Sequence, residues 1–255
     1  SYANRVLVEK VRGQNCHGHT FVTWNDPFLA EDVLAGPRSG NVFQNCLVIN
    51  RGERNSMDFA STDPHLGALL EDNINTGNVM RYNTLLNGAN IVIHTGWDTD
   101  VIGNRLVGGG SIGVHTNSRR VKITGNLIQN PTEVGIWVNG GSSPNQADPL
   151  RYGQDNEIVG NTIISAGIRG IGWERQKGGV IRNNTIVSSY QGMSLTSSDD
   201  CTVSDNRIRG TLTSCGIRIQ GTSTSERSKG LVVERNEIHG GAAEHALEIS
   251  NTSGI

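Results

Sequence analysis

Apolar and polar residues alternate in short runs along this chain, and the runs recur at a nearly constant interval. An apolar residue, two variable residues, Asn, a variable residue and a second apolar residue form a phrase that appears eight times. Its Asn residues are Asn45, Asn83, Asn104, Asn126, Asn161, Asn184, Asn206 and Asn236. The spacings from Asn83 onward are 21, 22, 35, 23, 22 and 30 residues, so four of the six agree within two residues. A period near 22 with Asn at a turn and β-branched residues around it predicts a right-handed parallel β-helix. We expect these Asn side chains to stack in one ladder from coil to coil.

A second phrase marks another strand of each coil. It is found at Met57–Ala60, Ala68–Asp72, Ile91–Thr95, Ile112–Thr116, Ile136–Asn139, Ile171–Arg175, Met193–Thr196, Ile217–Gln220 and Leu247–Ser250. Alternation with a period of two sends its first and third residues into the core and its second and fourth residues outward. The chain is therefore expected to be all-β, with three strands in each coil.

The longer intervals between phrases predict insertions into a single β-helix domain that spans residues 1–255. The insertions are residues 25–38, 140–154 and 221–229. Solenoids need polar capping units at their ends, and the sequence offers no clear cap. We expect missing chain segments or a partner to cover the ends, and a homo-oligomer (a trimer in a tailspike) is one such arrangement.

The register of the second phrase places particular side chains in two outward columns. The fourth-position column is Ala60, Glu71, His94, His115, Asn139, Glu174, Thr196, Gln220 and Ser250. The second-position column is Asp58, Leu69, Val92, Gly113, Trp137, Gly172, Ser194, Arg218 and Glu248. Neighbouring coils lie about 4.8 Å apart, so His94 and His115 should be able to hold one molecule between them. A cleft across the coils from Asp58 to Glu174 is the default site.

Other side chains near this cleft suit carbohydrate binding, although simple packing or solvation explains each of them equally well. Trp137 and Trp97 are candidate stacking platforms, because an apolar ring face matches the C–H face of a pyranose. Arg175 and Lys177, beside Glu174, form a candidate corner for carboxylates. Trp173 falls at an inward position and is expected in the core.

Spacing along the column separates pairs of carboxylates that can act together from pairs that cannot. The column places Glu71 and Glu174 four coils apart, or on the order of 19 Å. Paired carboxylates in glycosidases lie about 5–9.5 Å apart, so these two cannot form an acid and base pair. Asp58 and Glu71, which are expected on adjacent coils, could form such an acid and base pair.

Composition excludes several other classes of function. The net charge is −2, and Lys and Arg are scattered, which argues against nucleic acid. No run approaches 18 apolar residues, so no membrane span is expected. The four Cys form no C-x-x-C pair, which excludes zinc, and Cys201 and Cys215 fall at expected inward positions as free thiols. No cofactor is expected; Asp98 and Asp100 are candidate calcium ligands, but two carboxylates are too few to define a site.

Part of the chain resembles mannuronan C5-epimerases, within the broad group of β-helix uronate lyases and epimerases. The resemblance covers Asp63-Pro64-His65, Asn78–Asn83 and the Ile91–His94 strand, with a later likeness at Ile171–Arg175 and Val180–Asn184. It implies that Asp63 and His65 match the Asp and His of the family's Tyr-Gly-Phe-Asp-Pro-His motif. Ala60 stands where that motif has Tyr, and His94 stands where the family has a second catalytic Asp.

These observations favour an extracellular, secreted or virion-surface enzyme that acts on an acidic polysaccharide by β-elimination or C5 epimerisation. His94 or His115 would be the base, since an imidazole titrates near neutral pH, and activity should then fall below about pH 6. Asp63 and His65 would neutralise the uronate carboxylate, Asp63 only if protonated, and Arg175 would clamp a subsite. Two alternatives stay open: a tailspike-like glycoside hydrolase that uses Asp58, Glu71 or Asp63, and a non-catalytic glycan-binding adhesin.

Overall fold

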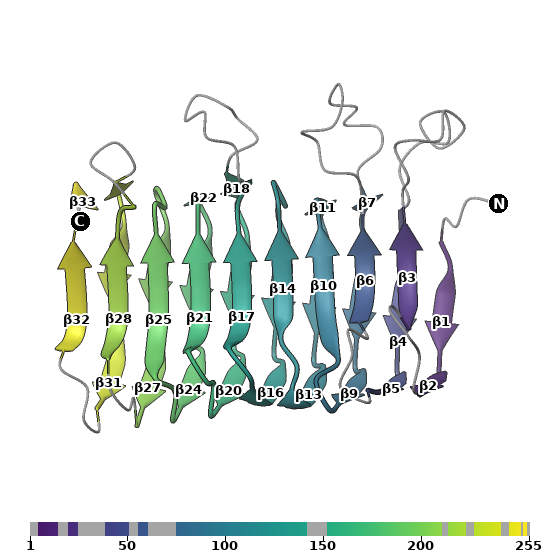
Figure 1. The fold of residues 1–255 in the computed structure, drawn as a ribbon. Helices are drawn as coiled ribbons and strands as arrows, with labels where there is room; N and C mark the ends of the chain where they lie inside the picture. Colours follow the sequence, from purple (N-terminus) through teal and green to yellow (C-terminus); the bar gives the residue numbers. More distant parts are fainter. Residues whose placement is uncertain are drawn as a thin grey trace.

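The chain forms a solenoid of parallel strands. The computed structural model describes residues 5–14, 20–24, 39–50, 56–60, 75–141, 152–210, 214–222, 227–240, 245–250 and 252–253. Within these ranges the chain builds three sheets of nine strands each, and every recorded strand pairing is parallel. Figure 1 shows the coils side by side along one axis, with the two termini at opposite ends. The parallel all-β solenoid expected from the sequence is confirmed.

Each coil contributes one strand to each of three sheets, which we call A, B and C. Sheet A contains β1 (Leu7–Glu9), β4 (Val42–Gln44), β8 (Val79–Arg81), β12 (Asp100–Ile102), β15 (Lys122–Thr124), β19 (Glu157–Val159), β23 (Val180–Arg182), β26 (Thr202–Ser204) and β30 (Val232–Glu234). Sheet B contains β2 (Arg12–Gln14), β5 (Leu47–Ile49), β9 (Thr84–Leu86), β13 (Arg105–Gly109), β16 (Leu127–Pro131), β20 (Thr162–Ile164), β24 (Thr185–Val187), β27 (Arg207–Arg209) and β31 (Glu237–His239). Sheet C contains β3 (Phe21–Trp24), β6 (Ser56–Ala60), β10 (Asn90–His94), β14 (Ile112–His115), β17 (Val134–Asn139), β21 (Arg169–Glu174), β25 (Gln191–Thr196), β28 (Cys215–Gln220) and β32 (His245–Ser250). Three two-stranded sheets pair β7 (Asn75–Thr76) with β11 (Gly96–Trp97), β18 (Gly153–Gln154) with β22 (Gln176–Lys177), and β29 (Ser228–Lys229) with β33 (Thr252–Ser253).

The core is a column of inward side chains that runs along the solenoid. Ile, Val, Leu and Met dominate it, because strands of parallel sheets pack one face against the interior at every coil. Trp173 is fully buried, as expected, and its Nε1 donates a hydrogen bond to the Cys201 sulfur at 3.4 Å. Cys46, Cys201 and Cys215 are free thiols. Cys201 and Cys215 are each 1% exposed, so the expectation of buried free thiols is confirmed for both. The Cys215 sulfur lies outside the hydrophobic core cluster and accepts from the Gln191 amide.

The Asn ladder exists from Asn83 to Asn236, at the turn between sheets A and B. At Asn161, for example, the side-chain oxygen accepts from the Asn126 backbone N–H at 2.9 Å, and its amide donates to the Ile123 carbonyl at 2.9 Å. Asn45 does not belong to the ladder, so that part of the prediction is wrong. Cys46 stands in register with Asn83, and Asn45 is exposed one residue earlier, at φ 54°. Asn tolerates this left-handed conformation better than most residues, which explains why it occurs there.

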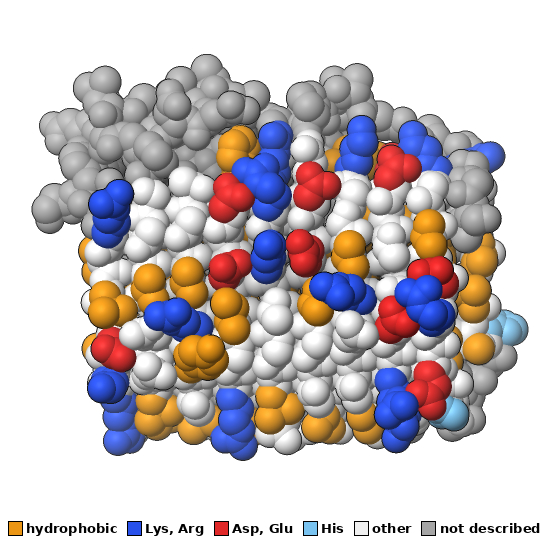
Figure 2. Space-filling view, turned by 180° about the vertical axis from the view of Figure 1, so that it is seen from behind, with side chains coloured by type: hydrophobic (Ala, Val, Ile, Leu, Met, Phe, Trp, Pro, Cys, Tyr) orange, Lys and Arg blue, Asp and Glu red, His pale blue; other side chains and the backbone are white. Residues whose placement is uncertain are grey.

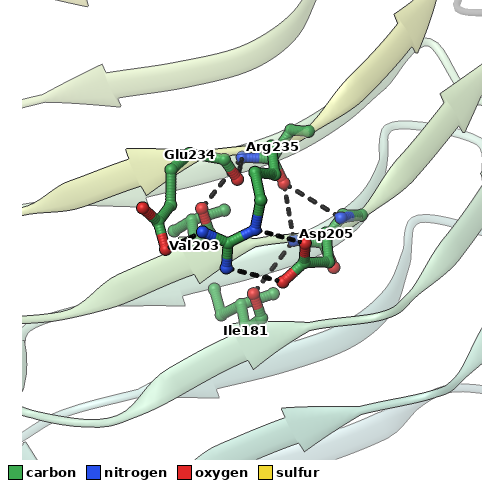
Figure 3. A network of polar contacts seen from close by, with 7 residues as sticks. Ile181, Val203, Asp205, Glu234 and Arg235 are labelled. Atoms are coloured by element: carbon green, nitrogen blue, oxygen red, sulfur yellow. Dashed lines mark hydrogen bonds and ion pairs between the residues drawn. The ribbon is translucent and has the colours of Figure 1, made fainter.

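The outer surface away from sheet C carries charges of both signs. Figure 2 shows Lys and Arg interspersed with Asp and Glu on that side. Many of these side chains pair between neighbouring coils. The Arg235 guanidinium, for example, contacts Asp205 of the preceding coil at 2.7 Å, and also Glu234 of its own coil at 2.6 Å (Figure 3). Such exposed pairs contribute little to stability, because water and salt screen their charges.

The three expected insertions lie mostly or wholly outside the described residues. This applies to all of 25–38, to 142–151 within 140–154, and to 223–226 within 221–229. Among the residues that the structure describes, no helix is long and apolar enough to cross a membrane.

Candidate functional site

The strand register of sheet C confirms both outward columns over most of their length. His94 pairs directly with His115, and Asn139 pairs with Glu174. The column continues through Thr196, Gln220 and Ser250. The second-position column runs from Asp58 through Val92, Gly113, Trp137, Gly172, Ser194 and Arg218 to Glu248.

Glu71 is the exception in the fourth-position column. Strand β6 pairs directly with β10, so Ala60 is the neighbour of His94 and no coil lies between them. The expectation that the Ala68–Asp72 phrase adds a coil there is therefore wrong, and with it the placement of Asp58 and Glu71 on adjacent coils. The phrase misled because its alternation is that of a strand. Glu71, Asp63 and His65 all lie outside the described residues.

Three rings from successive coils meet on the outer face of sheet C. The rings of His94 and His115 stack with their centroids 5.2 Å apart. The His115 ring then meets the Trp137 ring edge-on at 5.3 Å. Gly113 makes this possible, since a Cβ at Gly113 would lie 2.6 Å from the Nε2 of His115. The ring of His115 thus folds back over Gly113, in line with Trp137.

Burial controls the charge of His115. Desolvation, and secondarily the nearby His94, lowers the pKa of His115 to about 4. His115 is therefore neutral across the physiological range and can accept a proton without first losing one. The expected loss of activity below about pH 6 does not apply to His115, whose own titration lies about two pH units lower.

Asp58 lies on the same face, in β6, with 2% of its surface exposed. Burial raises the pKa of Asp58 to about 7, because the charged carboxylate is poorly solvated there. Asp58 thus keeps its proton well above the pH at which an exposed carboxyl loses it. A neutral carboxyl adds no negative charge to a face that would receive an anionic sugar.

The raised pKa of Asp58 predicts that the protein loses stability as pH rises. The folded state binds this proton more tightly than the unfolded state does, so the free energy of unfolding falls between about pH 4 and pH 7. The rise in pKa corresponds to on the order of 4 kcal/mol. The Asp58→Asn variant should therefore melt at a higher temperature than the wild type at pH 8 and lose the advantage at pH 4. Thermal melts at both pH values, with the exposed Asp155→Asn as control, test this; equal pH dependence in wild type and Asp58→Asn would refute it.

Two strained turns follow the histidines. Thr95 and Thr116 have φ of 52° and 54°, a left-handed conformation that β-branched residues rarely adopt. A residue held in this conformation lowers the stability of the folded state by on the order of 1–3 kcal/mol, and such residues are often found at functional sites. The strain lies immediately after the two ring-stacking strands.

Relief of this strain should stabilise the protein. Thr116→Asn places a residue that tolerates the left-handed region at the turn, so the free energy of unfolding should rise by about 1 kcal/mol. Chemical denaturation of the variant and the wild type measures this difference in the free energy of unfolding. Thr162→Asn, in the ordinary strand β20, is the matched control and should bring no gain. A Thr116→Asn variant no more stable than its parent would show that the turn is not strained.

Arginines engage Trp97 and one of the two candidate calcium ligands, Asp98. The Arg119 guanidinium lies over the Trp97 ring, 4.5 Å from its centroid, which covers the face expected to stack on a sugar. Both oxygens of Asp98 accept from Arg120, at 2.6 and 2.8 Å, which lowers the pKa of Asp98. Burial raises the pKa of Asp100. The described part of the chain contains no group of three or more His, Cys, Asp or Glu side chains placed to hold a metal ion.

On β21, Glu174 pairs with a residue that the sequence pattern did not single out. Its partner is Arg169, at 3.4 Å, from the start of the same strand. Arg175 is half-buried at φ 49°, and Lys177 is exposed in β22. Arg169 stands before the recurring phrase, outside both columns, so the column pattern did not predict its place in the site. Its position in register with Val134 and Gln191 is the signal that identifies it.

Comparison with known proteins agrees with this architecture. Residues 112–255, more than half of the chain, match the family model described as a right handed beta helix region. The right-handed β-helix expected from the sequence is thereby confirmed. No curated protein sequence matches the chain significantly.

Several solved structures share the fold at low identity. The periplasmic alginate epimerase AlgG is 11% identical, over 84% of this chain and 69% of that chain, with a TM-score of 0.50. The Streptococcus pneumoniae surface protein and adhesin PfbA is 9% identical, over 96% and 86% of the two chains, with a TM-score of 0.48. The Azotobacter vinelandii mannuronan C-5 epimerase AlgE6 A-module is 10% identical, over 97% and 79%, with a TM-score of 0.47. These similarities extend to the fold alone.

Proposed function

We propose that this chain, which belongs to the family with a right-handed beta helix region, acts on an acidic, uronate-containing polysaccharide by β-elimination or C5 epimerisation. The observation that carries the proposal is the stacked pair of His94 and His115 on the outer face of sheet C. Such a pair offers a base beside a long, open sheet on which a polymer can lie. The fold of the alginate epimerase AlgG is similar, so a β-helix of this kind is compatible with such an activity.

Both reactions begin by removing the proton on C5, α to the uronate carboxylate. In elimination the C5–H electrons form the C4=C5 double bond, the C4–O bond breaks, and the leaving oxygen takes a proton from an acid. In epimerisation a proton returns to C5 from the opposite face. We assign the base to the His94–His115 pair and the acid to Asp58, which keeps its proton up to about pH 7. Asp63 and His65 stay candidate neutralisers of the carboxylate.

The remaining residues suit the binding of a long substrate. Trp137 offers a ring beside His115, and Asn139, two residues along the same strand β17, offers an amide. Beyond them, the outward side chains of β25 are almost fully covered: Ser194 is 2% and Thr196 is 7% exposed. These two side chains therefore offer little surface to a sugar, and the Thr196 hydroxyl already accepts from the Gln220 amide at 3.3 Å. We also propose an extracellular or virion-surface location, where such polysaccharides occur.

The test is incubation with a panel of uronans and neutral glycans, following ultraviolet absorbance and reducing ends together. A lyase yields both signals, because each cleavage creates a conjugated double bond and a new end. A hydrolase yields reducing ends alone. An epimerase yields neither, and its product is recognised by a changed ratio of the two C5 epimers. If every substrate is bound but none is converted, the protein is an adhesin and the proposal fails.

A further inference from the structure

Two nitrogen donors on adjacent strands of sheet C have no hydrogen-bond acceptor. They are Nε1 of Trp137, in β17, and Nε of Arg169, in β21. Both atoms are shielded from solvent, and a buried donor without an acceptor costs about 1–3 kcal/mol. Natural structures retain few such groups, and those that persist call for an explanation such as a ligand.

Gly172 brings these two donors to the same place. It pairs with Trp137 across the strands and has no side chain to fill the space above it. A Cβ there would lie 3.0 Å from Cδ1 of Trp137 and 3.4 Å from Cδ of Arg169. These carbons are bonded directly to the two unpaired nitrogens. The indole therefore approaches the glycine from the neighbouring strand β17, and the guanidinium approaches it from the start of the glycine's own strand, β21.

The surroundings orient the guanidinium and add an acceptor. Glu174 takes a single bond from NH1 of Arg169, at 3.4 Å, which leaves Nε available. Asn139, in register with Glu174, has its Oδ1 buried without a donor. Two donors and one acceptor thus face the same stretch of sheet. A carboxylate with a neighbouring hydroxyl matches this set, since the carboxylate accepts from the donors and the hydroxyl donates to Oδ1.

We propose that Trp137 and Arg169, converging over Gly172, bind the carboxylate of an acidic sugar. The uronate nature of that sugar rests on the function proposed above. The same Trp137 ring meets His115 edge-on at 5.3 Å between centroids. A carboxylate held by Trp137 and Arg169 therefore lies next to the histidine pair to which we assign removal of the C5 proton. Arg169 also supplies the positive charge that stabilises the negative charge developing on the carboxylate as C5 loses its proton.

Binding of defined oligosaccharides, measured by calorimetry, tests the site without any turnover. The probes are trigalacturonate and trimannuronate, with their carboxyl-reduced, neutral counterparts. The wild type should bind an acidic probe more tightly than its neutral counterpart. Arg169→Gln should weaken binding of the acidic probe by about 10–100-fold and leave the affinity for the neutral probe unchanged. Trp137→Phe keeps an aromatic ring and removes the N–H, so it should weaken acidic binding by about 3–10-fold. Gly172→Ala should also weaken it, by filling the space between the two donors, although it removes no charge.

Arg218→Gln is the matched control. Arg218 lies on the same face, two strands away, but its Nε and Nη2 already donate to Glu248. Its loss should leave the preference for acidic probes intact. A wild type that binds acidic and neutral probes alike would overturn the inference, as would an Arg169→Gln variant that keeps the preference. A preserved acidic preference with no conversion of any uronan would instead retain this site and refute the proposed chemistry.

Discussion

His115→Phe should lower the turnover of a uronan by about 10²–10⁴-fold while the solenoid stays folded, since loss of a general base typically costs that much. The phenyl ring fills the space over Gly113 and keeps the edge contact with Trp137, but it has no nitrogen to accept a proton. The change in the free energy of unfolding should stay within about 1 kcal/mol, as for volume-conserving replacements. Steady-state kinetics and a thermal melt on the same preparation separate the two effects.

Ser250→Ala is the control for this variant, because Ser250 occupies the same column on β32, far from the ring cluster. It should keep the rate of the wild type. The pH profile adds a second readout: if His115 is the base, the rate should hold until about pH 4, where its imidazole becomes protonated. Unchanged turnover in His115→Phe, or an equal loss in Ser250→Ala, would remove His115 from the reaction.

Asn161→Ala should destabilise the protein by about 5 kcal/mol, because it removes several buried hydrogen bonds at once. Asn161 is 1% exposed and lies at the centre of the ladder. Its oxygen accepts from the backbone and side-chain amides of Asn126, and its amide donates to the Ile123 carbonyl and to Asn184. Truncation leaves several of these groups buried without a partner, and each costs about 1–3 kcal/mol.

Asn45→Gly is the matched control for the ladder. It replaces another Asn of the recurring phrase, but one that is exposed and at a positive φ, where Gly is well tolerated. Its effect should stay within about 0.5 kcal/mol. Chemical denaturation of both variants decides the matter. Similar losses in the two would mean that the side-chain ladder contributes little and that the backbone pairing alone holds the coils.

The sequence period predicted most of this fold because each coil has the same requirements for inward apolar residues and for a turn. A β-branched inward residue and an Asn at the turn are needed every 22 residues or so, and the strand pairing then fixes which side chains are neighbours. The pairing of His94 with His115 follows from this reasoning alone. The prediction for Asn45 was wrong because Asn occurs both in the ladder and at turns with a left-handed backbone, and the sequence alone does not distinguish these two roles. The Ala68–Asp72 phrase failed because alternation without the Asn turn is weak evidence for a coil.

The details of the site could not be predicted because they depend on the conformations of individual side chains. Nothing in the sequence shows that the ring of His115 bends over Gly113, or that this burial keeps the imidazole neutral. Arg169 stands outside the recurring phrase, and its approach to Trp137 depends on the missing side chain of Gly172. Trp97 is an apparent sugar platform by sequence, yet Arg119 from the next coil lies over its ring.

Loss of the C5 proton from a uronan, followed by proton NMR in D₂O, tests the central claim most directly. Elimination removes this proton and epimerisation replaces it with deuterium, whereas hydrolysis leaves it in place. With the wild type the C5–H signal of a uronan should disappear, and with His115→Phe it should persist over the same time. A C5–H signal that the wild type leaves unchanged, in uronans that it binds or cleaves, would contradict the proposal that this β-helix removes the proton α to a uronate carboxylate.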